Sequence, residues 1–152
     1  MDNYRYSRFC ENLNIANFET TGEFNMPVMM PYRKDIAEDY VSFNCAKSTK
    51  AKKDKCVHFF IDDYQFERVW RSPLQYIDLL SEFHSVMTPD FSLYTDYPKA
   101  IQIYNHYRKQ WLGVLWQSLG IDVIPTIAWS DKDSYAWCFY GVPKNAVVAV
   151  SS

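Results

Sequence analysis

The chain has 152 residues, of which 48% are hydrophobic and 18% aromatic, and its formal net charge at pH 7 is −2. This length and apolar content predict a single domain with a sizeable core, and the near-neutral charge excludes a basic field over the whole surface, so any nucleic-acid binding would have to be local. The polar N-terminus and the lack of a long apolar run predict a cytoplasmic protein with no membrane partner. The cysteines are widely spaced without a C-x-x-C pair, so no zinc site is expected.

The first part of the chain contains few regular patterns. Residues 1–25 alternate polar and aromatic side chains without a helical or strand period, and we expect a peripheral N-terminal arm there. Residues 26–31 form a short apolar run enclosed by prolines, which limits them to a short or edge strand. Five lysines between residues 47 and 55 predict an exposed loop. The β-branched and aromatic run over residues 56–63 predicts a buried strand that ends in two aspartates.

The rest of the chain alternates helix and strand signals. Ser72, Pro73 and Gln75 form the start signal of a helix that continues to about residue 83, with Ser72 as the expected N-cap. Pro98 opens a long helix of regular apolar spacing, which Gly120 ends. Short apolar runs predict three more strands, over residues 85–90, 121–130 and 146–152.

This alternation of strands and helices predicts the α/β fold class, with a mostly parallel sheet covered by crossover helices and a partial (β/α) barrel-like domain as one form of it. We expect one domain over residues 1–152. The last strand, over residues 146–152, has no following helix to cover it. Unpaired strand edges recruit other chains, so we expect self-association through this strand or a partner that covers it.

Four stretches of the sequence resemble the family called domain of unknown function 4417, and they occur in the same order over about residues 26–152: VHFFIDDYQFERVW (57–70), MTPDFSLYTDYPKAIQIYNHYRKQWLG (87–113), IDVIPTIAWS (121–130) and GVPKNAVVAVS (141–151). Members of that family occur in phages, plasmids and bacterial genomes. The resemblance implies an accessory protein of a mobile element in the host cell cytoplasm, and it implies no established activity or ligand. Members continue beyond the position of Ser152, so this chain is expected to be a short or truncated member.

Polar side chains follow the predicted strands where ligands bind in parallel α/β folds, outside the carboxyl ends of the strands. Asp62 and Asp63 end the first clear strand and Asp90 ends the second. Carboxylates gathered at one edge raise one another's pKa or hold a divalent cation, so these three aspartates are the candidate catalytic residues and a divalent cation is the candidate cofactor. The candidate binding residues are Arg68, Tyr94, Arg108, Trp129, Ser130 and Lys144.

A purely structural interpretation of these residues has the larger weight. Aspartates at strand ends often cap a following helix or pair with a cation such as Arg68 or Arg108. His58 is expected in the core, whereas His84 and His106 are expected at the surface. The remaining aromatic and thiol candidates are interpreted as core packing: Tyr104, Tyr107, Trp111, Trp116 and Cys138.

Two functions follow from these alternatives. The favoured hypothesis is a binding or regulatory accessory protein that engages a macromolecular partner through an aromatic-lined groove or an open sheet edge. The alternative is a carboxylate-dependent, metal-assisted hydrolase or transferase at the carboxyl ends of the strands. Carboxylate oxygens that converge to within about 5 Å in a pocket favour chemistry, because a cation must touch its ligands. Carboxylates that are each engaged by a helix N-terminus or an arginine favour binding.

Overall fold

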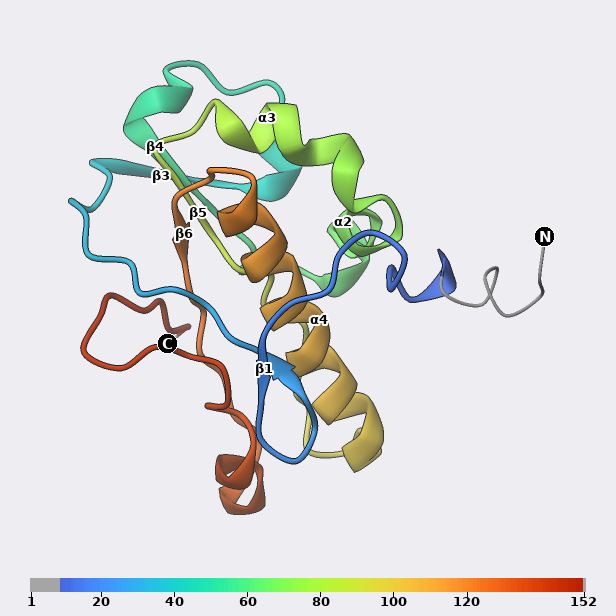
Figure 1. The fold of residues 1–152 in the computed structure, drawn as a ribbon. Coiled ribbons are helices and arrows are strands. Elements are labelled where there is room, and N and C mark those ends of the chain that lie inside the picture. The colour runs from blue at the N-terminus through green and yellow to red at the C-terminus, as the bar shows by residue number, and fades with distance from the viewer. Residues whose placement is uncertain (1–8, 152) are drawn as a thin grey trace.

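The computed structural model describes residues 9–151, which form a four-stranded parallel sheet, a two-stranded antiparallel sheet and a set of helices (Figure 1). The α/β fold class and the mostly parallel sheet are therefore confirmed. The strands of the parallel sheet are β3 (Asp39–Ser42), β4 (Lys55–His58), β5 (Ser85–Met87) and β6 (Val123–Ile124). The antiparallel sheet joins β1 (Thr20–Thr21) to β2 (Met26–Pro27).

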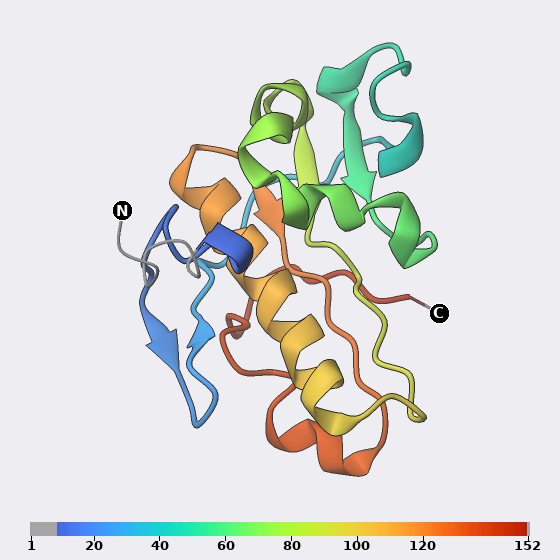
Figure 2. The same ribbon diagram turned by 90° about the vertical axis from the view of Figure 1, so that its right-hand side faces the viewer.

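The strands of the parallel sheet lie in chain order, β3-β4-β5-β6. Right-handed crossovers between neighbours in this order place the intervening helices on one face of the sheet. Two helices lie between β4 and β5, namely α2 (Glu67–Arg71) and α3 (Ile77–Ser81), and the long α4 (Lys99–Ser118) connects β5 to β6. Figure 2 shows these helices in front of the strands, with α4 as the longest of them.

Alternate strand residues belong to two different cores, as the period of a strand requires. Val57, Val86 and Val123 face the helices and share the larger core with residues of α2, α3 and α4. Their neighbours Cys56, Met87 and Ile124 join a smaller core on the opposite face, where Tyr32, Ala37 and Ala149 cover them. Burial on both faces explains why these strands are apolar throughout rather than alternating.

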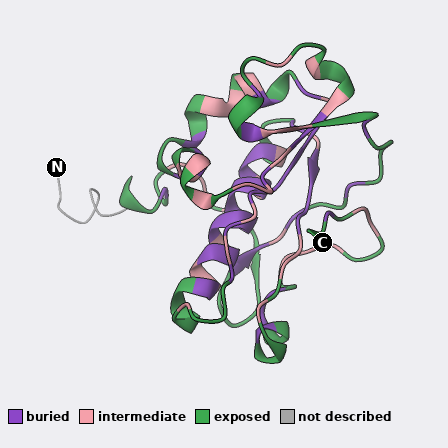
Figure 3. Cartoon of the chain, turned by 180° about the vertical axis from the view of Figure 1, so that it is seen from behind, coloured by how far each residue is buried: buried purple, intermediate pink, exposed green. Residues whose placement is uncertain are grey.

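Helix α4 is buried on most of its circumference and is the centre of the fold (Figure 3). Its apolar residues Trp111, Leu112, Leu115 and Trp116 fill the larger core. Gly120 ends the helical segment with φ +87°, as predicted for a C-cap. A second set of buried residues on this helix is polar, and it comprises Gln102, Asn105, His106, Arg108, Lys109 and Gln110.

Short 3₁₀ helices connect these elements, and one of them corrects the helix predicted over residues 72–83. That segment divides into the 3₁₀ turn η4 (Pro73–Tyr76) and α3. Ser72 does not cap with its side chain; its main-chain oxygen accepts a hydrogen bond from the Gln75 amide at 3.1 Å instead. The other 3₁₀ helices are η1 (Phe43–Cys45), η2 (Lys52–Asp54), η3 (Asp63–Gln65) and η5 (Lys132–Ala136).

The strands are shorter than predicted, and the C-terminal strand is the clearest case. Between residues 146 and 151, only Ala149 forms a bridge, parallel to Thr126. The Val147 amide donates to the Tyr32 carbonyl oxygen at 3.1 Å, so the chain leaves the edge of β6 there. Strand β6 itself ends before Pro125, which has no amide hydrogen to donate. Self-association through this end of the chain stays a prediction.

The N-terminal segment is attached to the body of the fold over its described part, residues 9–25. Strand β1 pairs with β2, and the Asn12 side chain donates to the Trp70 carbonyl oxygen at 2.7 Å. The rest of the predicted N-terminal arm, residues 1–8, lies outside the described residues. Strand β3 was not predicted, because it is a four-residue edge strand with two exposed residues. Within residues 9–151, we find no helix with the length and apolar character that a membrane span requires.

Candidate functional site

A cavity of about 410 Å³ lies where the chain leaves three neighbouring strands, and we call it the strand-end pocket. Residues 60–62 follow β4, residues 90–94 follow β5, and residues 128–129 follow β6. Ser151, just beyond the bridge at Ala149, completes the lining. The pocket thus lies at the carboxyl ends of the strands, which is the edge where ligands bind in parallel α/β folds.

The strand-end pocket contains four of the candidate site residues. Asp62, Asp90, Tyr94 and Trp129 line it, together with the aromatic and apolar side chains of Phe60, Ile61, Phe91 and Leu93. Tyr94 and Trp129 are about half exposed, at 59% and 46%. The other candidates, Asp63, Arg68, Arg108, Ser130 and Lys144, do not line it.

Asp63 lies next to the pocket lining and joins two of the loops that form it. Its carboxylate accepts one hydrogen bond from the main-chain amide of Ser92 at 3.0 Å and another from the Ser92 hydroxyl at 2.8 Å. These bonds tie the loop after β4 to the loop after β5. A carboxylate that is engaged in this way holds the two loops together through both of its oxygens.

Arg108 continues this network from α4. It donates to the Asn105 side-chain oxygen at 2.7 Å, and Asn105 donates to the Ser92 carbonyl oxygen at 2.7 Å. Arg108 also donates to a Glu67 carboxylate oxygen of α2 at 2.6 Å, and its guanidinium carbon lies 4.0 Å from the centre of the Phe91 ring. The arginine is therefore buried behind the pocket, where it holds loop and helices together.

Ser130 is likewise a structural residue beside the pocket. Its hydroxyl donates to the Gln102 side-chain oxygen at 2.6 Å, and its amide donates to the Ser134 hydroxyl at 3.0 Å. The Gln102 side chain donates in turn to the Tyr97 carbonyl oxygen at 2.9 Å. The loops after β5 and β6 are thus both fastened to the first half of α4.

Two candidates lie elsewhere on the protein. The Arg68 guanidinium carbon lies 4.9 Å from the centre of the Phe43 ring and 5.8 Å from that of Tyr76, so it packs over aromatic rings of neighbouring 3₁₀ helices. Lys144 is exposed in the turn that precedes the C-terminal segment. Neither residue lines the pocket. The order of strand ends in the sequence could not predict this, because it does not reveal where side chains between the strands point.

Asp90 lines the pocket and interacts electrostatically with Lys109, which is buried outside the lining. Burial raises the pKa of the Asp90 carboxyl, while the nearby Lys109 ammonium lowers it and the Asp63 carboxylate raises it. Lys109 is only 2% exposed, and burial lowers the pKa of its ammonium to about 8 although Asp90 opposes this shift. The lysine was not a sequence candidate, although it belongs to the polar run NHYRKQ inside a helix otherwise predicted to be apolar.

His106 corrects the prediction of a surface histidine. It is fully buried, its Nε2 lies 3.0 Å from the Tyr140 carbonyl oxygen, and burial lowers its pKa to about 3. His58 is half-buried, and its Nδ1 accepts the Phe60 amide at 3.3 Å. Cys138 is fully buried, and burial raises the pKa of its thiol, as expected for an inert packing residue.

Within residues 9–151, no group of three or more histidine, cysteine, aspartate or glutamate side chains is placed to hold a metal ion. The three candidate aspartates illustrate this arrangement: Asp62 is exposed, Asp63 binds Ser92, and Asp90 lies within the electrostatic reach of Lys109. None of the described hydrogen bonds and ion pairs joins these three carboxylates to an arginine or to a helix N-terminus, so the choice between binding and metal-assisted chemistry stays a proposal.

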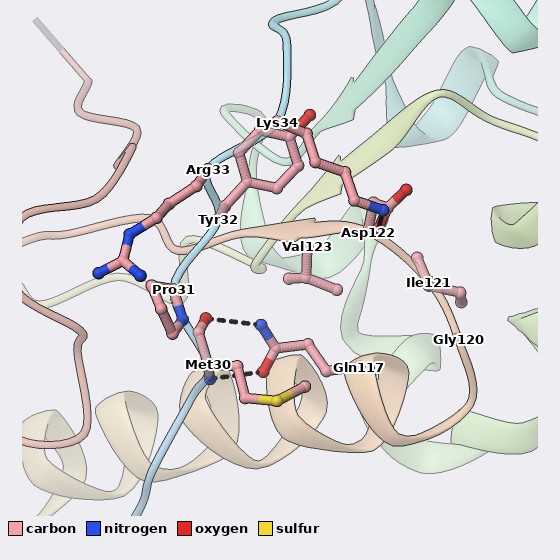
Figure 4. Close-up of a pocket in the computed structure, with 10 residues that line it drawn as sticks. All are labelled: Met30, Pro31, Tyr32, Arg33, Lys34, Gln117, Gly120, Ile121, Asp122 and Val123. Carbon is pink, nitrogen blue, oxygen red and sulfur yellow. Dashed lines mark hydrogen bonds and ion pairs between the residues drawn. The ribbon is translucent and has the colours of Figure 1, made fainter.

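A larger cavity of about 540 Å³ lies at the other end of β6, between residues 30–34 and residues 117–123 (Figure 4). Most of its polar side chains have partners: Lys34 pairs with Asp122, and the Gln117 amide bonds to both the amide and the carbonyl of Met30, at 2.9 Å and 2.8 Å, while Arg33 is exposed at its rim. We therefore prefer the strand-end pocket as the functional site, although it is the smaller cavity.

Comparison with known proteins gives a family and no activity. The chain is 41% identical over 144 residues to the Gene 1 protein of Mycobacterium phage L5, and 47% identical over 143 residues to the Gene 1 protein of Mycobacterium phage D29. Each match covers 93% of this chain, which spans 62% and 52% of the two relatives. No solved structure matches. The family model described as Domain of unknown function (DUF4417) matches residues 18–152, and the chain belongs to this phage-associated family.

Proposed function

We propose that the protein is a binding module of a phage accessory system and that its strand-end pocket accepts a positively charged group. The observation that supports this proposal most is the composition of the lining. Asp62 and Asp90 contribute two carboxylates, and the described residues that line the pocket include no lysine, arginine or histidine. A concave site with charge of one sign attracts ligands of the opposite sign.

The aromatic side chains in the lining suit the same ligand. Phe60, Tyr94 and Trp129 surround the carboxylates. A cation over an aromatic face gains about 0.5–2 kcal/mol, and guanidinium groups use this contact more often than ammonium groups. An arginine or lysine side chain of a partner protein therefore matches both the charge and the aromatic character of the pocket.

The walls of the pocket are preorganised for binding. Asp63 connects two of the loops through Ser92, and Ser130 connects a third loop to α4. Loops that are held before the ligand arrives lose less conformational entropy on binding, which improves affinity without any new contact. The buried polar residues of α4 thus support the pocket from behind.

The direct test is titration with N-acetyl-arginine amide, followed by NMR shifts of the Trp129 indole. We expect saturable shifts that weaken with added salt, and binding that Asp62→Asn and Asp90→Asn each reduce by about tenfold, which corresponds to roughly 1.4 kcal/mol. The matched control is Asp78→Asn, which removes the same charge from exposed α3 outside the pocket. Equal affinity in all these variants would refute the proposal.

A second candidate function is carboxylate-dependent hydrolysis or group transfer with Asp90 as the general acid. It is favoured by the raised pKa of Asp90, which burial and the Asp63 carboxylate both support. Hydrolysis of bis(p-nitrophenyl) phosphate with and without millimolar Mg²⁺ or Mn²⁺ tests it. Turnover that Asp90→Asn abolishes while arginine binding persists would establish this function, and a cation-dependent rise in melting temperature would establish its metal-assisted form.

A further inference from the structure

A row of exposed aromatic side chains extends from the strand-end pocket across the surface of η5. Trp129 lines the pocket, and its ring centre lies 6.5 Å from that of Tyr135 at an interplanar angle of 62°. The Tyr135 ring is stacked on Phe139, with centres 6.0 Å apart and an angle of 24°. We call these three residues the aromatic row. Their exposed fractions are 46%, 52% and 43%, so each leaves about half of its surface to solvent.

The aromatic row is held in place by the buried side of the same segment. Ser134, Trp137 and Cys138 point inward and are at most 3% exposed. Trp137 and Cys138 share a small core with Leu93, and the Cys138 amide donates to the Ser134 carbonyl oxygen at 2.8 Å. Tyr135 lies between these anchors and Phe139 directly follows them, and both face outward. Exposed aromatic rings on a fixed backbone are typical of recognition surfaces.

Charge around the aromatic row distinguishes between classes of partner. The η5 segment contributes Asp131 and Asp133 against the single Lys132, and the adjoining pocket contributes Asp62 and Asp90. Phosphate backbones require cationic surfaces, so a row of aromatic rings beside four carboxylates does not suit single-stranded nucleic acid. A basic polypeptide is the partner whose charge complements this surface.

We propose that the aromatic row and the strand-end pocket form one continuous site for an extended segment of a partner protein, with an arginine or lysine in the pocket and apolar side chains along Trp129, Tyr135 and Phe139. This inference rests on the proposed function and specifies its ligand. Two side chains of an extended segment that point to the same side are about 7 Å apart, which is close to the spacing of neighbouring rings in the row.

The test compares two synthetic hexapeptides, Arg-Ser-Leu-Ser-Leu-Ser, in which the arginine and both leucines point to the same side of an extended segment, and arginine followed by serine alone. Calorimetric titration measures their affinities for the full chain. We expect the leucine peptide to bind at least tenfold more tightly. The double variant Tyr135→Ser/Phe139→Ser should remove this difference and leave the affinity for N-acetyl-arginine amide unchanged. The matched control is Tyr40→Ser, which removes an aromatic residue of similar exposure, 45%, from strand β3.

The outcomes separate the two proposals. Equal affinity for both peptides, or a leucine advantage that survives in the double variant, overturns the extended site while arginine binding in the pocket still supports the proposed function. Leucine-peptide binding that depends on the aromatic row but not on Asp62 overturns the cationic pocket. Binding of an oligothymidylate that the double variant abolishes overturns the choice of a polypeptide partner.

Discussion

Asp63 and Ser92, which are 29 residues apart in the sequence, are joined by two hydrogen bonds, from the Ser92 amide at 3.0 Å and from its hydroxyl at 2.8 Å. This pair closes the wall of the strand-end pocket between the loops after β4 and β5. It also converts a residue that resembles a catalytic aspartate into a structural one. The adjacent Asp62 is exposed and makes no such bond to Ser92, so the two neighbouring aspartates have different environments.

The first prediction compares these two aspartates. Asp63→Ala leaves the Ser92 amide without its acceptor and should lower the free energy of unfolding by about 1–3 kcal/mol. Asp62→Ala, at an exposed position, should change it by no more than about 0.5 kcal/mol. Urea denaturation of both variants measures the difference. Equal losses would show that the bonds to Ser92 do not stabilise the fold.

Gly141 and Gly120 give a second matched pair. Both adopt positive φ, +77° and +87°, but a Cβ on Gly141 would lie 2.1 Å from the Pro27 carbonyl oxygen, whereas a Cβ on Gly120 would meet nothing within 4 Å. Gly120→Ala should therefore cost about 1 kcal/mol, for the backbone conformation alone. Gly141→Ala should cost at least about 3 kcal/mol or prevent folding, because main-chain atoms have to move.

Thermal unfolding of the two glycine variants, followed by circular dichroism, measures this contrast. If Gly141→Ala has the same melting temperature as Gly120→Ala, β2 and residue 141 are not closely packed. Gly141 also accepts the Met29 amide at 2.9 Å through its carbonyl oxygen, so the same variant should loosen the segment after β2.

The buried His106 should make the stability of the fold depend on pH in the acidic range. Its folded pKa is about 3 because burial opposes its charged form, and an unfolded histidine titrates near 6.5. A depressed folded pKa contributes stability that is complete above pH 6.5 and is lost as pH falls toward 3. Each pH unit within this window should cost about 1 kcal/mol.

The His106→Gln variant should show a shallower loss of unfolding free energy than the wild type between pH 6.5 and pH 4.5. Other groups that titrate in this range contribute to both proteins and cancel in the difference. His84→Gln is the control, since His84 is partly exposed and bonds through Nδ1 to its neighbour Ser85 at 3.1 Å. Parallel pH profiles of the wild type and His106→Gln would contradict the prediction.

Lys109 gives a prediction on the alkaline side. Its folded pKa is about 8 and its ordinary value is 10.5, so the unfolded chain binds more protons than the folded protein between these values. Stability due to this residue should therefore rise with pH from 8 to 10.5. The free energy of unfolding of the wild type should increase over this range relative to that of Lys109→Met. Methionine has a side chain of similar length to lysine but no proton to lose.

Lys99→Met is the control for Lys109, because Lys99 is exposed at the start of the same helix. The difference between the wild type and Lys109→Met should change more between pH 8 and pH 10.5 than the difference between the wild type and Lys99→Met. If the difference in unfolding free energy between the wild type and Lys109→Met does not change with pH, the buried lysine has an ordinary pKa.

The sequence determined the order and type of the main elements. The hydrophobic period and the prolines and glycines that end helices and strands are local properties of the chain. The long helix is the best example, since Pro98 and Gly120 mark its ends and α4 occupies Lys99–Ser118. The strand-end rule also nominated Asp62, Asp90 and Trp129 for the pocket, because parallel strands bring their carboxyl ends to one edge.

Only the tertiary structure decided which polar residues face the pocket and which support it. Arg108 and Asp63 resemble ligand-binding residues in the sequence, yet each is occupied by partners far along the chain, Glu67 and Ser92. His106 and Lys109 lie in the polar run of α4, and they are buried because loops packed against both sides of that helix exclude water from it. Side-chain direction depends on contacts between distant segments, and no local pattern in the sequence specifies those contacts.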